Sequence, residues 1–180
     1  MRAACLPCSQ LSTNRLNHVE PFCVYYLTTM EKTDHDWMIE AIELSKQCPP
    51  AETFNVGCLV LNAEGKLVAS GFSRERDGGV HAEETALAKV DEDRLLVEGG
   101  TLYSTLEPCH PRLSGKTSCT QHIINHKIRR VVYAAKEPKF FVVCKGAETL
   151  TERGIEVIHL QELEELVQEI NVHIFRNLPE

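Results

Sequence analysis

The sequence is short of basic residues. It holds 19 Lys and Arg residues against 26 Asp and Glu residues, which gives a formal net charge of −7. A protein that binds the nucleic-acid backbone needs a basic face, so this balance disfavours a nucleic-acid partner. A local basic patch around a small phosphorylated ligand is still compatible with it.

Long apolar runs are also missing. Near the N-terminus the longest is residues 22–27, which is far too short to span a bilayer, and no apolar segment of a secretion signal follows Met1 and Arg2. We therefore expect a cytoplasmic protein without a membrane partner. Because cytosolic thiols stay reduced, the eight cysteines are expected to be metal ligands, catalytic groups or core residues rather than disulfides.

Helical or strand periodicity is absent from residues 1–32, which are rich in Ser, Thr, Asn and Cys. We expect this segment to be a disordered N-terminal extension, and residues 33–180 to form one domain with its own core. The domain begins with a helix, because Thr33 is a good N-cap with Asp36 at the N3 position and apolar residues follow at helical spacing.

Beyond this helix, strands alternate with helices. Residues 62–65 predict a hairpin turn between the first two strands. The alternation indicates an α/β domain with parallel strand pairs in its later half. Strands are expected at residues 55–61, 67–71, 101–105, 130–135 and 155–160, and helices at 81–90, 119–126, 148–153 and 162–174.

Three segments carry side chains that bind metals or move protons. His81-Ala82-Glu83 opens a predicted helix, residues 105–109 follow a predicted strand, and Cys119 begins the next helix. Open α/β sheets place their sites at such strand ends. Each segment alone has a simpler explanation, either a solvated helix turn or a buried core cysteine. Together they supply the imidazole and the thiolates that zinc prefers.

The number of ligands favours a catalytic metal site. His81, Cys109 and Cys119 make three, and catalytic zinc sites keep a fourth position for water, whereas structural sites are closed by four ligands. Glu83 lies two residues beyond His81 and could move protons there without being a ligand. The alternative for Glu83 is a carboxylate that the positive end of the helix dipole favours.

These segments resemble the zinc boxes of the cytidine and deoxycytidylate deaminase superfamily. The resemblance covers roughly residues 34–160. It implies a three-layer α/β/α sandwich around a central mixed sheet of about five strands. It also implies one Zn²⁺ per chain and hydrolytic deamination of a pyrimidine-like ring, with Glu83 as the catalytic residue.

The second zinc box departs from the usual superfamily pattern, which has two residues between its cysteines. Nine residues separate Cys109 from Cys119. This long loop is similar to that of the pyrimidine deaminase of riboflavin biosynthesis, which ends in Gly-Lys/Arg-Thr-Pro-Pro-Cys where this chain has residues 115–119, Gly-Lys-Thr-Ser-Cys. The resemblance implies a phosphorylated diaminopyrimidine as substrate. At 180 residues, we expect no reductase domain of the kind that bacterial enzymes often append.

Two other positions depart from the bacterial riboflavin enzymes and resemble the fungal branch. Thr53 stands where the bacterial enzymes carry Asn before Pro, and Ser73 stands where they carry His. The Ser-Arg-Glu sequence at residues 73–75 and Arg-Leu-Ser-Gly at 112–115 also resemble that branch. The resemblance implies substrate contacts at Thr53, Asn55, Ser73, Ala82 and Thr105.

The loop between the two cysteines carries His110, Arg112 and Lys116, and residues 110–120 contain no acid. Such a loop beside a metal can hold a phosphate through charge-assisted hydrogen bonds, so these three residues are also expected to contact substrate. The alternative is a solvated surface loop. We expect His110 to contact substrate or to support the site rather than to be a fourth ligand.

Other functions remain open at this point. A deoxycytidylate or cytosine-type nucleotide or nucleoside deaminase would use the same scaffold. A nucleic-acid-editing deaminase is disfavoured by the charge of −7. A non-catalytic zinc-binding module is disfavoured by the intact Glu83. The expected partners are a small pyrimidine phosphate and a second copy of the chain in a homodimer.

Overall fold

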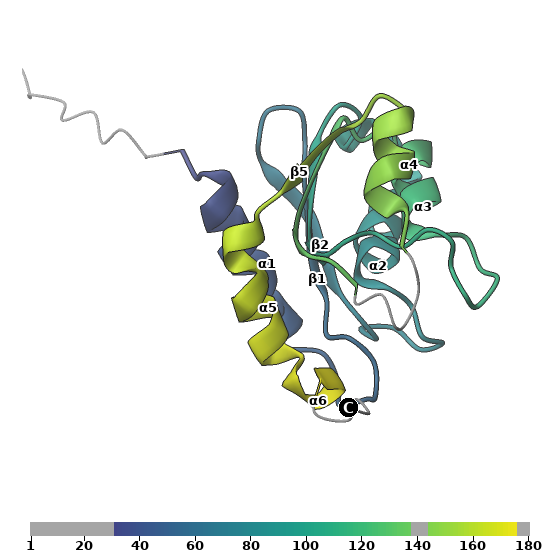
Figure 1. Ribbon diagram of the computed structural model, residues 1–180. Coiled ribbons are helices and arrows are strands. Elements are labelled where there is room, and N and C mark those ends of the chain that lie inside the picture. The colour runs from purple at the N-terminus through teal and green to yellow at the C-terminus, as the bar shows by residue number, and fades with distance from the viewer. Residues whose placement is uncertain (1–30, 138–143, 176–180) are drawn as a thin grey trace, which may run out of the picture. The chain divides into compact units, whose positions relative to one another are not determined.

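A mixed five-stranded sheet forms the centre of the computed structural model, which describes residues 31–137 and 144–175 (Figure 1). Its antiparallel part pairs β2 with β1 and β1 with β3, and its parallel part pairs β3 with β4 and β4 with β5. The predicted mixed sheet with later parallel pairs is therefore confirmed. In spatial order the strands are β2 (Leu67–Phe72), β1 (Gly57–Leu61), β3 (Thr101–Leu106), β4 (Arg130–Ala135) and β5 (Glu156–His159).

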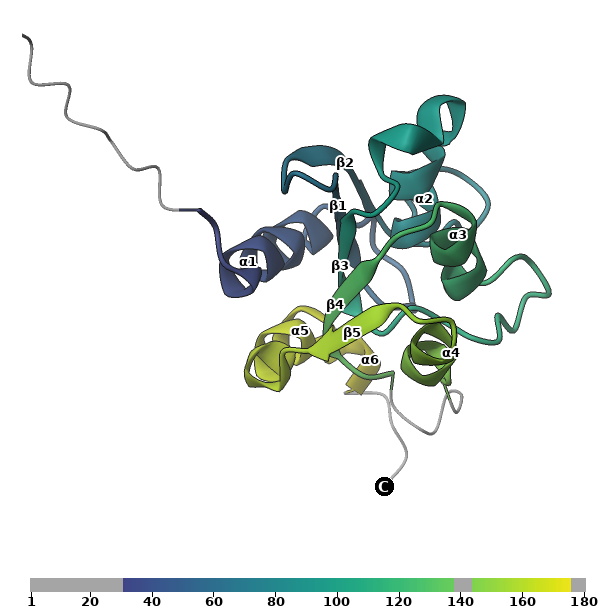
Figure 2. The same cartoon turned by 90° about the horizontal axis from the view of Figure 1, so that it is seen from above.

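Helices cover both faces of the sheet (Figure 2). On one face lie α1 (Asp34–Ser45) and α5 (Glu164–Ile170), and the short α6 (Val172–Phe175) continues from α5. On the other face lie α2 (Ala82–Ala88), α3 (Cys119–Asn125) and α4 (Gly146–Glu152). This is the expected three-layer sandwich. Strands β1, β3 and β4 are almost wholly buried, because each has helices on both sides.

The first helix starts where its capping residues predict. The Thr33 backbone N–H donates to Asp36 Oδ2 at 2.8 Å, and the Asp36 backbone N–H donates to Thr33 Oγ1 at 3.3 Å. The described residues from Lys32 onward form one compact unit. Of the predicted N-terminal extension, residues 1–30 lie outside the described residues.

Several predicted element boundaries were wrong. β1 begins at Gly57 rather than Asn55, because the Asn55 backbone N–H is bonded to the side chain of Asn171 and not to a neighbouring strand. The predicted helix over residues 162–174 is broken into η2 (Gln161–Leu163), α5 and α6, with the break between α5 and α6 at Asn171. A 3₁₀ segment, η1 (Asp91–Leu96), also follows α2 and was not predicted.

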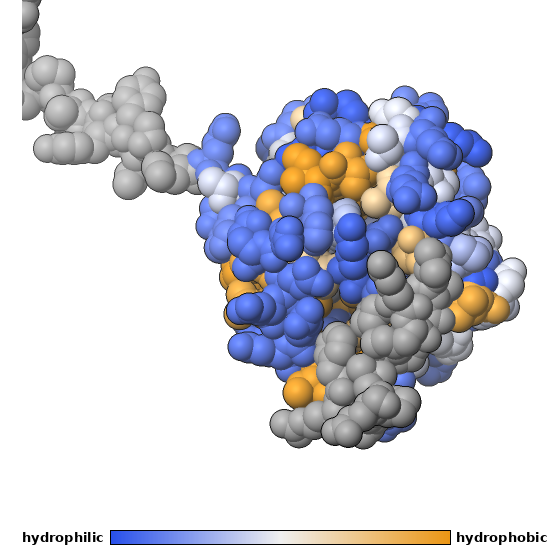
Figure 3. Space-filling model, in the orientation of Figure 1, coloured by the Kyte–Doolittle hydropathy of each residue, from blue (hydrophilic) through white to orange (hydrophobic). Residues whose placement is uncertain are grey.

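No helix in the described part of the chain is both long and apolar enough to cross a bilayer. On the face drawn in Figure 3, hydrophilic side chains predominate and apolar ones gather in small separate groups.

Candidate active site

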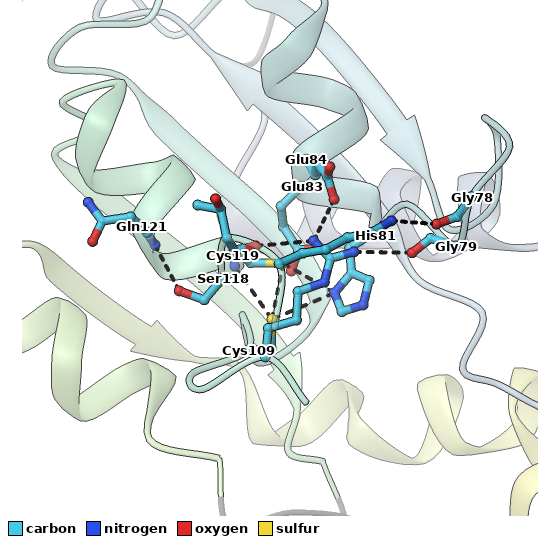
Figure 4. Close-up of polar contacts among 12 residues, drawn as sticks. Gly78, Gly79, His81, Glu83, Glu84, Cys109, Ser118, Cys119 and Gln121 are labelled. Carbon is cyan, nitrogen blue, oxygen red and sulfur yellow. Dashed lines mark hydrogen bonds and ion pairs between the residues drawn. The ribbon is translucent and has the colours of Figure 1, made fainter. Parts of the chain in front are cut away.

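The side chains of His81, Cys109 and Cys119 converge at one point (Figure 4). The Cys109 and Cys119 sulfurs are 3.4 Å apart, and His81 Nδ1 lies 3.6 Å from the first and 3.3 Å from the second. Tetrahedral zinc at its usual bond lengths would separate such ligand atoms by roughly 3.6–3.8 Å. The three residues therefore fit zinc in both donor type and spacing. Within the described residues, His110 is not part of this cluster.

Close backbone packing brings the three ligands together. His81 is the N-cap of α2, and a Cβ on Gly71 of β2 would lie 2.7 Å from backbone atoms of Ala82 and Ala86. A Cβ on Gly146, the first residue of α4, would lie 1.8 Å from the Pro108 carbonyl oxygen, directly before Cys109. Only glycine permits either approach, so these two positions let α2 lie close to β2 and α4 lie close to the segment before Cys109.

The two cysteines share a hydrogen-bonded arrangement at the start of α3. The Cys119 backbone N–H donates to Cys109 Sγ at 3.4 Å. Hydrogen bonds from Cys119 and His81 lower the pKa of the Cys109 thiol to about 4, so this sulfur is a ready thiolate ligand. The hydrogen bond of Cys119 to Cys109 and its burial raise the pKa of the Cys119 thiol, and metal binding would have to displace its proton.

Glu83 points into the same site from the first turn of α2. Its side chain accepts hydrogen bonds from Ser104 Oγ at 3.0 Å through Oε1 and from Cys119 Sγ at 3.3 Å through Oε2. Glu83 is only 3% exposed, and this burial raises the pKa of its carboxyl group. A carboxyl group whose pKa is raised toward neutrality can both accept and return a proton.

A cavity of about 410 Å³ opens beside Glu83 and the metal ligands. Of the predicted substrate contacts, Thr53 and Ser73 line it, and so do the ligands His81 and Cys109. Four of its lining residues are glutamates, namely Glu52, Glu83, Glu107 and Glu137. A cavity this rich in hydrogen-bond acceptors suits a ligand that presents several N–H donors.

Three of the predicted substrate contacts lie next to the cavity rather than among its lining residues. The Asn55 side chain accepts a hydrogen bond from Arg74. Ala82 is fully buried at the first position of α2. Thr105 Oγ1 accepts from the Gly57 backbone N–H at 3.2 Å and so joins β3 to the start of β1.

The loop of residues 110–118 is tied to the segment that precedes His81. Arg112 is 3% exposed at its side chain and pairs with Glu84 Oε2 at 2.6 Å, and it also donates to the Gly79 carbonyl oxygen at 3.1 Å. Lys116 Nζ donates to the Gly78 carbonyl oxygen at 2.7 Å. The loop has no acidic residue of its own, and Arg112 instead pairs with Glu84 of α2.

His110 contacts its own loop and helix, since its Nδ1 lies 3.2 Å from Thr120 Oγ1 and 3.5 Å from Ser118 Oγ. His110, Arg112 and Lys116 are all absent from the described lining of the cavity. Each lies next to it: His110 follows the lining residue Cys109, Arg112 is bonded to the lining residue Gly79, and Lys116 is bonded to Gly78.

Sequence reasoning missed five polar residues of the site. These are Glu52, Arg74, Ser104, Glu107 and Glu137, none of which was singled out as a site residue. Glu107 accepts from the Ala147 backbone N–H at 2.8 Å and holds the start of α4. Burial raises the pKa of Glu137. The available signal was position, because Glu107 and Glu137 each come directly or almost directly after a buried strand.

A buried glutamate beside a His/Cys/Cys metal cluster on this α/β scaffold defines a zinc-dependent deaminase site. The chain belongs to the cytidine and deoxycytidylate deaminase family, whose zinc-binding region matches residues 31–135. This agrees with the predicted family and with the predicted zinc cofactor.

Within this family, the chain is similar to relatives that are named as pyrimidine deaminases or as proteins of riboflavin biosynthesis. The chain is 41% identical over 136 residues, 73% of its length, to a diaminohydroxyphosphoribosylamino-pyrimidine deaminase of Schizosaccharomyces pombe. It spans 33% of that protein, and 32% of a RibD protein of Actinobacillus pleuropneumoniae, so about a third of these longer relatives. It is 37% identical over 122 residues, 66% of this chain and 78% of the relative, to a deaminase of the same name from Buchnera aphidicola.

The fold of this chain is also similar to a solved structure from the same branch. The Rib2 deaminase of Aspergillus oryzae superposes with a TM-score of 0.66 at 30% sequence identity. The match covers 76% of this chain and 88% of the fungal chain.

Proposed function

We propose that this chain hydrolytically deaminates a phosphorylated diaminopyrimidine of riboflavin biosynthesis and releases ammonia. One observation carries the reaction type, namely the buried Glu83 carboxylate 3.3 Å from a sulfur of the His/Cys/Cys cluster and open to the cavity. The substrate class is supported by the relatives, whose names include diaminohydroxyphosphoribosylamino-pyrimidine deaminase.

In this mechanism His81, Cys109 and Cys119 hold the zinc. The metal, when bound, lowers the pKa of water to about 7 and so provides a nucleophile at neutral pH. Glu83 takes a proton from the attacking water at Oε2, delivers it to a ring nitrogen, and then assists the departure of ammonia. Ser104 donates to Glu83 Oε1 at 3.0 Å and keeps the carboxylate turned toward the cavity.

Other side chains of the cavity are assigned to substrate recognition. The carboxyl groups of Glu52 and Glu137 are suited to the ring N–H and amino groups that a diaminopyrimidine has in excess over cytosine. Thr53 and Ser73 supply hydroxyl groups that can donate or accept. We assign the phosphate to Lys116, because it is exposed and bonded to a carbonyl next to the cavity rather than to a carboxylate.

An ammonia-release assay with zinc-loaded protein tests this proposal. The panel contains ribosyl and ribityl diaminopyrimidine phosphates, their dephosphorylated forms, deoxycytidylate and cytidine. We expect the fastest turnover with a phosphorylated diaminopyrimidine and none from a Glu83→Gln control. Faster turnover of deoxycytidylate would replace the proposed substrate, and no ammonia from any compound would support a non-catalytic zinc module.

A cytoplasmic location and a homodimer also belong to this proposal, and both rest on the sequence. Size-exclusion chromatography with light scattering tests the second: a mass of about 20 kDa, that of the single chain, would contradict the dimer.

A further inference from the structure

We infer that Asn171, in the C-terminal part of the fold, is a positioning residue for substrate. It acts by holding the loop of residues 51–56, which we call the pocket loop. This inference rests on the proposed function. Five of the six residues in the pocket loop line the cavity, and the exception is Asn55. The loop therefore forms one wall of the site without carrying any metal ligand or Glu83.

Asn171 binds the backbone of the residue that does not line the cavity. Its Oδ1 accepts from the Asn55 backbone N–H at 2.7 Å, and its Nδ2 donates to the Asn55 carbonyl oxygen at 3.2 Å. The second Nδ2 hydrogen is used by the Val167 carbonyl oxygen at 2.9 Å. The side-chain amide thus pairs with Asn55 as a neighbouring strand would, and it does so across 116 residues of sequence.

The environment of Asn171 makes this contact specific. The residue is 1% exposed, and both its amide oxygen and its amide nitrogen are hydrogen-bonded. An apolar side chain of the same size would leave the Asn55 N–H and C=O without these partners. α5 ends at this position and α6 begins one residue later, so the helical break lies where the chain approaches the pocket loop (Figure 1).

A second side chain, Arg74, also holds the pocket loop. Arg74 donates to Thr53 Oγ1 at 2.8 Å, to the Phe54 carbonyl oxygen at 3.0 Å and to Asn55 Oδ1. Side chains therefore hold Thr53, Phe54 and Asn55 of the pocket loop, whereas the Val56 carbonyl accepts from the Ser73 backbone N–H at 2.9 Å. Losing Asn171 leaves Arg74 in place, so the loop should shift without unfolding.

The chemical centre does not depend on this contact. Glu83 and His81 come from α2, Cys109 follows β3, and Cys119 begins α3, all outside the pocket loop and α5. Asn171→Leu should therefore raise KM for the diaminopyrimidine phosphate about tenfold while kcat stays within about twofold and zinc content is unchanged. Gln168→Leu, an exposed change on α5, is the matched control and should alter neither constant.

Hydrogen exchange at the Asn55 amide provides a readout that needs no substrate. We expect Asn171→Leu to speed exchange at Asn55 while the amides of β3 and β4 stay protected. Asn171→Ser, which leaves room for a bridging water, should show a smaller rise in both exchange and KM, and it serves if the leucine variant does not fold.

Two outcomes would overturn the inference. One is an unchanged KM together with faster exchange at Asn55, which would mean that the loop position does not affect binding. The other is a fall in kcat, zinc content and melting temperature together, which would mark Asn171 as a general stability residue. If the wild-type protein deaminates nothing in the panel, the proposed function fails, and the exchange experiment still decides whether Asn171 holds the loop.

Discussion

Glu83 combines two properties that are rarely found in one carboxylate. It is almost fully buried, which raises its pKa, and it still faces the cavity and the ligand sulfur of Cys119. Burying a charged group is costly unless it is hydrogen-bonded, and Ser104 provides part of that compensation. A carboxyl group kept in this state is suited to repeated proton transfer rather than to structural pairing.

Replacing Glu83 with Gln keeps the shape of the side chain and removes the proton acceptor. We expect kcat to fall by about 10²–10⁴-fold or more, because general acid–base groups have effects of this size and Glu83 would serve several transfers. Elemental analysis should find zinc retained. Substantial ammonia release by a zinc-loaded Glu83→Gln protein would contradict the mechanism, and Ser104→Ala should show a smaller loss of kcat.

The residues that could be foreseen from sequence are those in local patterns. His81 and Glu83 share one helix turn, and Cys109 and Cys119 stand at element boundaries that periodicity predicts. Ser104 could not be foreseen, because its contact with Glu83 depends on how β3 lies against α2 in space. The role of Asn171 could not be predicted for the same reason, because its hydrogen-bond partner, Asn55, lies 116 residues away in the sequence.

At the scale of elements, the long loop between the zinc cysteines is anchored rather than free. Arg112 ties it to Glu84 of α2 and to the Gly79 carbonyl, while Lys116 remains exposed. The sequence suggested a cationic loop. In the structure, Arg112 forms a buried ion pair, whereas Lys116 is exposed and bonded only to the Gly78 carbonyl among the contacts described. These two roles predict different effects of substitution.

Arg112→Met should act on stability. It removes the buried partner of Glu84 and releases the loop that leads to Cys119, so we expect a loss of about 1–3 kcal/mol in the free energy of unfolding. Zinc should also exchange faster with a chelator. Thermal denaturation and chelator competition measure the two effects. An unchanged melting temperature would show that the tie contributes nothing.

Lys116→Ala should act on substrate. We expect KM for the phosphorylated diaminopyrimidine to rise about ten- to a hundredfold, the loss of a hydrogen bond to a charged group, with the melting temperature unchanged. The dephosphorylated substrate should lose much less, because it lacks the group that Lys116 would contact. Equal losses for both substrates would place Lys116 outside the phosphate site.

Element types could be predicted far better than their ends. The strands follow from apolar runs bounded by turn residues, and the Thr33 cap marks the start of α1. The final helix was predicted as continuous because its apolar spacing continues through Asn171. In the structure α5 ends just before Asn171, whose side chain makes the tertiary contact with Asn55 that the spacing does not reveal.

For the whole molecule, the domain begins with a cap that needs nothing before it. Thr33 and Asp36 satisfy each other, and Lys32 lies over the Trp37 ring at 4.2 Å. We therefore expect a chain that lacks residues 1–29 to keep the melting temperature and turnover of the full chain. A marked drop in melting temperature on this truncation would show that the removed segment packs on the domain.

Zinc should stabilise the fold of the whole domain as well as serve the reaction. Its three ligands come from the start of α2, the end of β3 and the start of α3, which are separate segments of the chain. A ligand present at 1,000 times its dissociation constant stabilises a fold by about 4 kcal/mol, and each kcal/mol is worth about 2–4 °C in a domain of this size. Removing zinc with a chelator should therefore lower the melting temperature by about 8–16 °C and abolish ammonia release, and added zinc should restore both.

The control is Glu83→Gln, which keeps all three ligands and should show a similar drop in melting temperature on chelation. Activity in metal-free protein would refute the zinc mechanism, and an unchanged melting temperature would show that the metal serves catalysis without supporting the fold.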